Sequence, residues 1–435
     1  MKKICLTLMA ATILICGCSG KSSTLDVPPA SDGLAAPEDL AWWSRAPIDA
    51  YMRFSAGSGS HSGSIAMFAR DGVVVYSNAA GWKDIASGQP MTINTPVRIA
   101  SMTKPITAVA AMILVQEGKL GLDDPVADYL PEFAALRVAT SDTPNADGSF
   151  PSAPASTVLT VRHLLTFSSG IGPGRDKDSA LVAYWDQKGI YDQPAGELSD
   201  RVALLAQLPL LEEPGTRWRY GFSLDVLARV IEVISGDSIS AFMQARILQP
   251  LGMKDTGYLP PASDRDVFAT VYTQDKEGEL INAPLPYDTS WTPGGGGMVS
   301  TAADYMRFAL MLWNGGEYQG VRILKEATVD NMRRLHIQDG VLAAEDIKGL
   351  GWGLGWGLGW GLGWGLGVAV VADEAATIMP DRTDDFWWSG YCGTTFFISP
   401  ETGLVGVVMS QNEPGEFSGL PVEIFIVQGM VFAGL

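Results

Sequence analysis

Short apolar and β-branched runs near both ends of the chain predict antiparallel strand pairs. Near the start, Ser64 to Arg70 and Val73 to Asn78 are separated by an Asp-Gly dipeptide, a strong hairpin signal. Near the end, Thr394 to Ser399 and Leu404 to Ser410 flank a Pro-Glu-Thr-Gly turn. Because strands at the two ends can pair with each other, we expect one antiparallel sheet closed by both termini.

Helical patterns occupy much of the remaining chain. Good helix formers run from Met102 to Glu117 and precede Gly118, and three further segments look helical: Leu224 to Ile234, Ala302 to Trp313, and Val422 to Phe432. Thr301 and Asp304 form a capping pair at the start of one of them. Residues 136–160 carry turn-forming residues and are expected to be a loop. The pattern predicts an α/β protein in which helices flank the antiparallel sheet and a mostly helical second subdomain is inserted.

One segment has an unusual repeat. From Gly349 to Gly367 every second residue is glycine, and the residues between them alternate between leucine and tryptophan. At about 3.3 Å per residue a single strand of this kind would run on the order of 60 Å, so we expect a strand that doubles back or a protruding flap. The segment could form an apolar wall for a substrate. We favour the simpler interpretation, a tandem expansion of one structural strand.

The first residues predict export. Lys2 and Lys3 precede an apolar run from Ile4 to Gly17 that is too short to span a bilayer with ordinary flanks. The run ends in Ile-Cys-Gly-Cys, which resembles a bacterial lipobox and implies cleavage after Gly17 and a lipid on Cys18. An ordinary signal peptide with incidental cysteines is the alternative. We expect the protein to be lipid-anchored to the bacterial cell envelope, at the outer membrane or in the periplasm.

These features predict three regions along the chain. Residues 1–17 form a signal peptide, 18–36 a flexible tether rich in Ser and Pro, and 37–435 the folded domain. Within that domain, we expect the sheet to come from about 37–100 and 296–435, and the helical insert from about 101–295.

Composition limits the partners and the sites. With 47% hydrophobic and 18% charged residues, the 435-residue chain can bury a large core. Loss of the two signal lysines would lower the formal charge from −18 to −20, which disfavours nucleic acid and leaves membrane anchoring to the lipid. Only Cys392 would remain as a free cysteine, so no internal disulfide is expected. Three histidines without a CxxC or HExxH motif argue against a metal site.

The central chemical feature is Ser101-Met102-Thr103-Lys104 at the start of a predicted helix. A serine hydroxyl is a poor nucleophile until a base takes its proton, and a lysine three positions later lies on the same helix face. Lys104 is the only lysine in the chain with a serine three positions before it. It must lose its own proton to act as a base, which burial would favour. An incidental surface pair is the alternative interpretation.

The surrounding sequence resembles the class C β-lactamase-like family of the penicillin-binding protein superfamily, and its esterase branch, the family VIII carboxylesterases. The similar segments follow the family's order between about 97 and 410: Arg98 to Pro105, Gly118 to Val126 with Tyr129 to Pro131, Val161 to Thr166 with Ser169-Gly170, Pro214-Gly215 with Trp218 to Ser223, and Gly295 to Thr301. The resemblance implies a β-lactamase/transpeptidase-like fold and acyl transfer without a metal or organic cofactor.

The resemblance also assigns further site residues. Tyr220 matches the tyrosine that shuttles a proton between the nucleophile and the leaving group, although its residue type would equally suit a half-buried core position. Trp388-Ser389-Gly390 matches a strand triplet that is Lys-Thr-Gly in lactamases and Trp-x-Gly in the esterases. The match implies an oxyanion hole formed by the backbone N–H groups of Ser101 and Tyr391.

Two departures from the lactamase pattern favour ester substrates. Phe222 stands where an asparagine is expected two places after the tyrosine, and Trp388 stands where the triplet has its cation. A missing charge-assisted contact costs roughly 1.5–3 kcal/mol, which would weaken binding of a β-lactam carboxylate. Phe222 and Trp388, with Ser389 and Gly390, are instead expected to form an apolar substrate pocket.

Rival interpretations remain open at this point. A Ser-His-Asp hydrolase would need a Gly-x-Ser-x-Gly elbow, and the run from Gly221 to Asp225 lacks the second glycine. His163 stands in an apolar context and is expected to be a core histidine. We expect a serine hydrolase that cleaves small carboxylic esters through an acyl-enzyme on Ser101. A β-lactamase or D-Ala-D-Ala carboxypeptidase, or a non-catalytic peptidoglycan-binding lipoprotein, are the alternatives.

Overall fold

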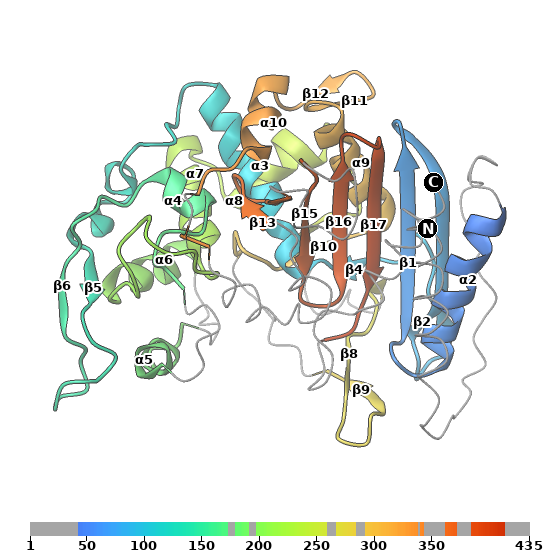
Figure 1. The fold of residues 1–435 in the computed structure, drawn as a ribbon, viewed down its shortest axis with the longest axis horizontal. Helices are drawn as coiled ribbons and strands as arrows, with labels where there is room; N and C mark the ends of the chain where they lie inside the picture. The colour runs from blue at the N-terminus through green and yellow to red at the C-terminus, as the bar shows by residue number, and fades with distance from the viewer. Residues whose placement is uncertain are drawn as a thin grey trace.

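A computed structural model describes residues 42–172, 179–190, 197–258, 267–283, 292–337, 340–342, 362–371 and 384–413. Its largest element is an eight-stranded antiparallel sheet with the strand order β13-β14-β15-β16-β17-β1-β2-β3 (Figure 1). The strands are β1 (Gly63–Arg70), β2 (Val73–Asp84), β3 (Gln89–Pro90), β13 (Leu362–Trp364), β14 (Ala369–Val371), β15 (Phe386–Gly390), β16 (Thr394–Ser399) and β17 (Leu404–Ser410).

The sheet is closed in its middle by the two ends of the chain. β1 pairs with β17 from Ser64 opposite Ser410 to Arg70 opposite Leu404. Both predicted hairpins are present, since β1 pairs with β2 and β16 with β17. The expectation of one antiparallel sheet built from both ends is therefore confirmed.

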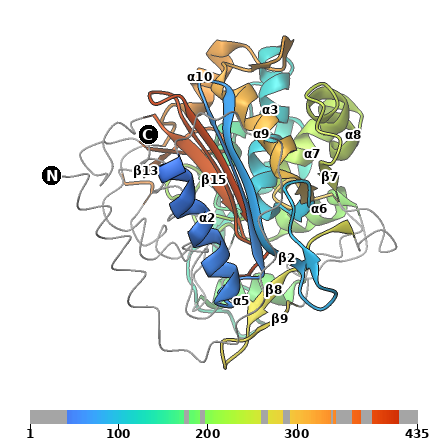
Figure 2. The same cartoon turned by 90° about the vertical axis from the view of Figure 1, so that its right-hand side faces the viewer.

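Helices cover both faces of this sheet. α2 (Trp42–Gly57) lies on one face, and α9 (Ala302–Trp313) packs on the other, with α3, α6, α7 and α8 on the same side as α9 (Figure 2). The others are α3 (Thr103–Gln116), α4 (Val161–Leu165), α5 (Ala180–Gln187), α6 (Leu198–Gln207), α7 (Ser223–Ser235), α8 (Ile239–Met243) and α10 (Glu326–Arg333). Four short helical segments join them: the 3-10 turns η1 (Ala100–Met102), η2 (Val126–Asp128) and η3 (Pro131–Ala135), and a π-helical turn, η4 (Gln244–Leu248).

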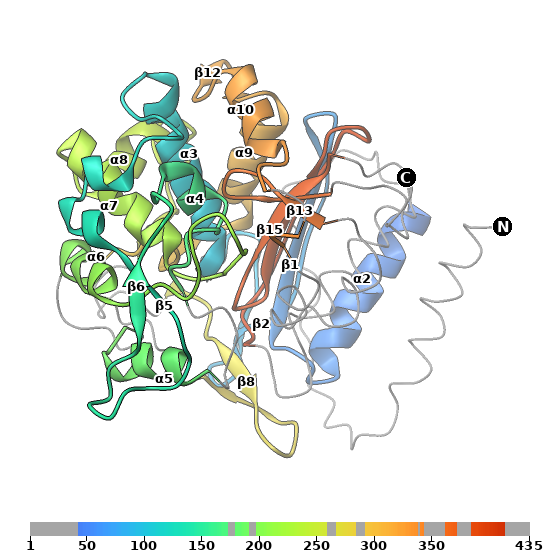
Figure 3. The ribbon, with the colours of Figure 1, turned by 60° about the vertical axis from the view of Figure 1, so that its left-hand side comes forward.

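A helical layer stands apart from the large sheet, on the side away from α2. Figure 3 shows α3, α4, α6, α7 and α8 gathered there. Small sheets border this layer: β4 (Val97–Arg98) with β10 (Met298–Ser300) and β7 (Gly257–Tyr258), β5 (Arg137–Ala139) with β6 (Ser152–Pro154), β8 (Tyr272–Gln274) with β9 (Leu280–Asn282), and β11 (Glu317–Tyr318) with β12 (Val321–Arg322). The sheet flanked by helices and the helical second layer match the predicted fold class.

Local signals in the sequence explain several boundaries. The Thr301 side chain accepts a hydrogen bond from the Asp304 N–H at 3.2 Å and starts α9, as the capping pair predicted. α7 ends at Gly236, which has the left-handed φ of 78° that glycine tolerates.

The expected helix at 422–432 lies outside the described residues, as do the signal peptide and tether. The region 136–160, expected to be a loop, contains the β5–β6 hairpin.

The described part of the glycine–tryptophan repeat doubles back. β13 ends at Trp364 and pairs antiparallel with β14, with Trp364 opposite Ala369. The chain reverses in a turn closed by the Gly365 N–H, which donates to the Val368 carbonyl at 3.0 Å. The earlier units lie outside the described residues.

Candidate active site

Ser101 lies in a tight turn between a strand and a helix. β4 leads into η1, and η1 leads directly into α3. The preceding residue, Ala100, has φ of +43°, a conformation that non-glycine residues rarely adopt and that is often found at functional sites. The Tyr305 hydroxyl donates to the Met102 carbonyl at 2.9 Å and fixes the turn from the α9 side. Ser101 therefore lies in a short turn that leads directly into α3, at the start of the helix as the sequence predicted.

Lys104 is on the first turn of α3 and faces Ser101. Its side chain is 4% exposed, and Nζ lies 3.2 Å from the Ser101 Oγ. Nζ also donates a hydrogen bond of 2.5 Å to the carbonyl of Gly295, in the loop before β10. The spacing of three residues thus brings the two side chains together, as predicted, and a distant loop holds the amine in place.

Tyr220 reaches the same oxygen from another element. It stands just before α7, and its hydroxyl donates to Ser101 Oγ at 2.5 Å. Its ring faces Lys104, with Nζ 4.6 Å from the ring centroid. The chain holds this position by a close approach of two glycines, since a Cβ on Gly221 would lie 2.4 Å from the Cα of Gly172.

Asp225 is a site residue that sequence reasoning missed. Its carboxyl group lies on the first turn of α7, is 3% exposed, and accepts the Gly295 N–H at 3.4 Å. Burial raises the pKa of Asp225, and the positive charges of Lys104 and Arg201 oppose that rise. Sequence analysis considered Asp225 only as the end of an incomplete nucleophile elbow. An acidic residue in an otherwise apolar helix start was the available signal.

The strand triplet lies beside the turn that carries Ser101. A Cβ on Gly390 would lie 2.2 Å from the Ile99 carbonyl oxygen, so only glycine lets β15 approach η1 this closely. The Thr394 hydroxyl donates to the same carbonyl at 3.3 Å. Tyr391 follows β15 directly and is 37% exposed. The two backbone segments predicted to form an oxyanion hole are thus neighbours.

Trp388 packs behind Tyr220. Its side chain is 1% exposed, its ring centroid lies 5.7 Å from that of Tyr220, and it meets Trp364 edge-on at 4.7 Å. Ser389, the next residue of the triplet, donates from its hydroxyl to Thr395 Oγ1 at 3.0 Å. The Trp388 side chain is therefore packed against other aromatic rings of the protein, and the Ser389 hydroxyl is hydrogen-bonded within it.

Phe222 is half-buried at the start of α7. Its ring faces the guanidinium of Arg201, whose central carbon lies 5.0 Å from the ring centroid. An aromatic ring thus stands two residues beyond Tyr220, as the sequence indicated.

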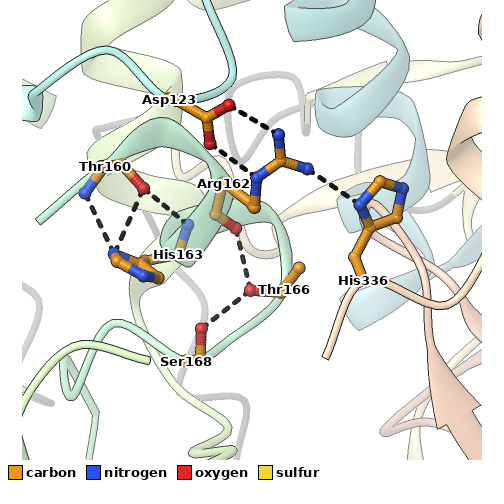
Figure 4. A network of polar contacts seen from close by, with 7 residues as sticks. All are labelled: Asp123, Thr160, Arg162, His163, Thr166, Ser168 and His336. Atoms are coloured by element: carbon orange, nitrogen blue, oxygen red, sulfur yellow. Dashed lines mark hydrogen bonds and ion pairs between the residues drawn. The ribbon is translucent and has the colours of Figure 1, made fainter. Parts of the chain in front are cut away.

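Two of the three histidines, His163 and His336, lie in a separate polar network (Figure 4). Thr160 caps α4, and His163 Nδ1 lies 3.2 Å from the Thr160 backbone nitrogen. Arg162 binds Asp123 with two hydrogen bonds of 2.7 and 2.8 Å, and its Nη1 lies 2.9 Å from His336 Nδ1. Burial lowers the pKa of both histidines, and the Arg162 charge lowers it further. The contacts of His163 are those of a helix-capping residue.

Comparison with known proteins identifies the family. The chain matches the family model described as Beta-lactamase over residues 47–428. The chain belongs to this family. Esterase EstB from Burkholderia gladioli is 32% identical over 381 residues, which are 82% of this chain and 88% of EstB.

Solved structures agree with that assignment to the β-lactamase family. EstCE1, a hydrolase with promiscuous acyltransferase activity, shares 27% identity at a TM-score of 0.73 and covers 90% of this chain and 99% of its own. A penicillin-binding protein from Bacillus halodurans is 21% identical, with a TM-score of 0.64 and coverage of 89% and 99%, and it shows the shared fold. The resemblance found in the sequence is confirmed, and the chain is a serine hydrolase of the β-lactamase family.

The described part of this β-lactamase-family chain shows neither a metal cluster nor a membrane-spanning helix. Within the described ranges, no cluster of three or more His, Cys, Asp or Glu side chains could hold a metal ion. Over the same part of the chain, no helix is both long enough and apolar enough to cross a membrane.

Proposed function

We propose that the protein hydrolyses small carboxylic esters through an acyl-enzyme on Ser101. The observation that supports this most strongly is the meeting of three side chains from distant parts of the chain. The Ser101 hydroxyl has the Lys104 amine at 3.2 Å and the Tyr220 hydroxyl at 2.5 Å. Two proton-handling groups in reach of one hydroxyl are what an activated serine needs.

The reaction has two acyl-transfer steps. As Ser101 Oγ bonds to the ester carbonyl carbon, its proton passes to the Lys104–Tyr220 pair, and the carbonyl oxygen takes the negative charge. The bond from that carbon to the alcohol oxygen then breaks, and Tyr220 returns the proton to the leaving alcohol. Water repeats the sequence in reverse roles: its oxygen bonds to the acyl carbon, its proton passes to the pair, and Ser101 Oγ leaves with a proton.

Backbone N–H groups stabilise the oxyanion in this proposal. The donors are the amides of Ser101 and Tyr391, which lie on η1 and just after β15. The close approach of Gly390 to Ile99 brings these two segments together. Donors that are fixed in advance lower the barrier because they need no rearrangement as charge develops.

Ester substrates fit the residues around Tyr220 better than β-lactams do. Phe222 and Trp388 occupy the positions at which the lactamase pattern has an amide and a cation, and both are aromatic. A β-lactam carboxylate would therefore lose a charge-assisted contact there. The names of EstB and EstCE1, an esterase and a hydrolase, support the same choice.

The alternatives are less well supported. A lactamase or D-Ala-D-Ala carboxypeptidase would share the acyl-enzyme but would need another anion anchor. A non-catalytic binding protein would have no use for two hydrogen-bonding partners on one serine. We further propose that the enzyme is exported and anchored by a lipid on Cys18, as the lipobox-like sequence indicates.

Substrate turnover and covalent labelling test the proposal together. Nitrophenyl esters of graded acyl length, a chromogenic cephalosporin and a D-Ala-D-Ala peptide are each incubated with the wild type and with Ser101→Ala. We expect short esters to be cleaved fastest, and Ser101→Ala to be inactive. A serine-directed phosphonate should add its mass to the peptide that holds Ser101. Labelling at Ser223 instead would refute the assignment of the nucleophile.

A further inference from the structure

The last tryptophan of the glycine–tryptophan repeat is built into the core next to the site. Trp364 ends β13, is 1% exposed, and donates from its indole N–H to the Leu165 carbonyl at 3.3 Å. Sequence analysis favoured an expanded structural strand for the whole repeat. The contacts of Trp364 indicate a more specific role for this last tryptophan of the repeat.

Trp364 contacts three aromatic residues that, in the described part of the chain, pack around Tyr220. Its ring centroid lies 4.7 Å from Trp388, 5.1 Å from Phe167 and 5.2 Å from Trp218. The same three rings lie 5.7, 5.5 and 6.1 Å from the ring of Tyr220. Two of the Trp364 contacts are edge-on, at interplanar angles of 89° and 90°, which is a favoured geometry for aromatic pairs. These three rings thus connect Trp364 to Tyr220 by direct aromatic contacts.

Hydrogen bonds hold the backbone of residues 364–367 on two sides. The His336 N–H donates to the Trp364 carbonyl at 2.9 Å, and the Leu366 N–H donates to the Met332 carbonyl at 2.8 Å. The Gly367 N–H donates to the Leu165 carbonyl at 2.9 Å. Trp364 therefore has little freedom to move relative to the end of α4 and the end of α10.

The packing around residues 364–367 requires glycine at positions 365 and 367. A Cβ on Gly365 would lie 2.1 Å from the Met332 carbonyl oxygen. Gly367 has φ of +81°, and a Cβ there would lie 2.3 Å from the Cβ of Ala108, one turn after Lys104 on α3. The sequence Trp-Gly-Leu-Gly at 364–367 is thus matched to its surroundings residue by residue.

We propose that Trp364 is a positioning residue that fixes the ring of Tyr220, through Trp388, Phe167 and Trp218, in the place where its hydroxyl meets Ser101. This inference rests on the proposed function, in which Tyr220 transfers a proton. Displacements of about 1 Å in a catalytic group can cost on the order of a hundredfold in rate. A side chain that is almost fully buried behind Tyr220 should affect the chemical step far more than it affects ester binding.

The first test compares two buried tryptophans. Trp185 in α5 is fully buried and donates its indole N–H to the Pro209 carbonyl at 3.2 Å, so it matches Trp364 in burial and hydrogen bonding. In the full-length enzyme, Trp364→Ala should lower kcat at least about tenfold with KM nearly unchanged, and Trp364→Phe should recover most of the loss. Trp185→Ala, at similar loss of thermal stability, should leave kcat within about twofold. Equal losses in kcat from the two alanine variants would overturn the inference.

A double-mutant cycle separates positioning from general damage. Tyr220→Phe removes the hydroxyl, so adding Trp364→Ala to it should lower kcat, and the rate of phosphonate labelling of Ser101, by less than about twofold more. A full tenfold further loss would refute the positioning role and leave the proposed function intact. Activity that is unchanged in Tyr220→Phe alone would refute the proposed proton route, and with it this inference. If Trp364→Ala does not fold, Trp364→Leu and Trp185→Leu take the same comparison.

Discussion

Lys104 and Asp225 face each other across a single glycine. A Cβ on Gly295 would lie 3.2 Å from the Lys104 Nζ and 2.9 Å from the Asp225 Oδ2, so no other residue fits between them without displacement. The glycine carbonyl accepts from the lysine, and its N–H donates to the carboxyl group. The buried acid therefore lies close to the lysine and is hydrogen-bonded to the loop that holds it.

Replacing Asp225 should disturb the loop that holds Lys104. Asp225→Asn keeps an acceptor for the Gly295 N–H, so it should lower kcat less than Asp225→Leu, which has no acceptor. Asp225→Leu also leaves buried positive charge unbalanced, so it should lower the free energy of unfolding by about 3 kcal/mol. Ester turnover and urea denaturation of the two variants check this, and equal losses of kcat would argue against this role.

Local sequence signals predicted the parts of the fold that depend on neighbouring residues. The cap formed by Thr301 and the hairpin turns lie within a few residues of the elements they begin or join, so a single sequence carries them. The helix α2 was not predicted, and Pro47 within it gives a contrary signal. The short strands β5 and β6 were missed because three-residue strands have no measurable periodicity.

The residues of the active site also differ in whether neighbouring sequence or distant contacts determine their positions. Ser101 and Lys104 are three residues apart, so their spacing alone brought them together, and Tyr220 required the family resemblance. Asp225 was missed because Gly295, which connects it to Lys104, comes from a distant part of the chain. The burial of Trp388 depends on Trp364, and no local pattern indicates which unit of a repeat packs there.

Shortening the repeat should leave the enzyme active if the final unit is kept. Deletion of residues 350–361 removes three of the four Leu-Gly-Trp-Gly units and keeps the part that contacts Met332 and Leu165. Ester hydrolysis and the melting temperature should stay close to those of the wild type, because a tandem expansion adds no contact that the fold needs. Activity lost in a variant that still folds and melts normally would show that the earlier units are part of the site.

His336 should make the protein less stable as the pH falls. Its Nε2 donates to the Asn331 carbonyl at 2.7 Å, and its Nδ1 accepts a hydrogen bond from the Arg162 guanidinium, which requires an unprotonated Nδ1. Burial chiefly lowers the pKa of His336, with added repulsion from Arg162 and Arg334, while the hydrogen bond to Asn331 and the charge of Asp123 act in the opposite direction. The unfolded chain therefore takes up a proton first, and stability should fall as the pH drops below the ordinary histidine value of about 6.5.

His336→Gln tests this dependence. The variant cannot titrate, so its free energy of unfolding, measured by urea denaturation, should fall less steeply between about pH 6.5 and pH 5 than that of the wild type. His163 has a lowered pKa as well and remains in both proteins, so part of the slope should persist. Identical slopes in the two proteins would mean that His336 is not the group responsible.

The lipid anchor can be tested by one substitution. If the sequence Ile-Cys-Gly-Cys directs lipidation, cells should yield a membrane-bound protein that begins at an acylated Cys18, and Cys18→Ala should release it in soluble form. Cys16→Ala is the matched control, since Cys16 would be removed with the signal. A native N-terminus at any residue other than Cys18, found by mass spectrometry, would rule the anchor out.

Substrate class should depend on the residue at position 388. The wild type should cleave short-chain esters well and cephalosporins slowly, because an indole offers no charge to a carboxylate. Trp388→Lys should lower ester turnover, since the indole packs against Tyr220 and Trp364, and should raise the ratio of cephalosporin to ester turnover. A gain of about 1.4 kcal/mol in the transition state corresponds to a tenfold change in that ratio.

Trp388→Met separates the charge from the packing. Methionine is close to lysine in length and loses the same aromatic contacts, but it carries no charge. The ratio of cephalosporin to ester turnover should therefore rise in Trp388→Lys and stay near the wild-type value in Trp388→Met. An equal rise in both variants would mean that space, and not a cation, limits lactam turnover. A wild type that already hydrolyses cephalosporins faster than every ester tried would show that the enzyme is a lactamase despite its missing lysine.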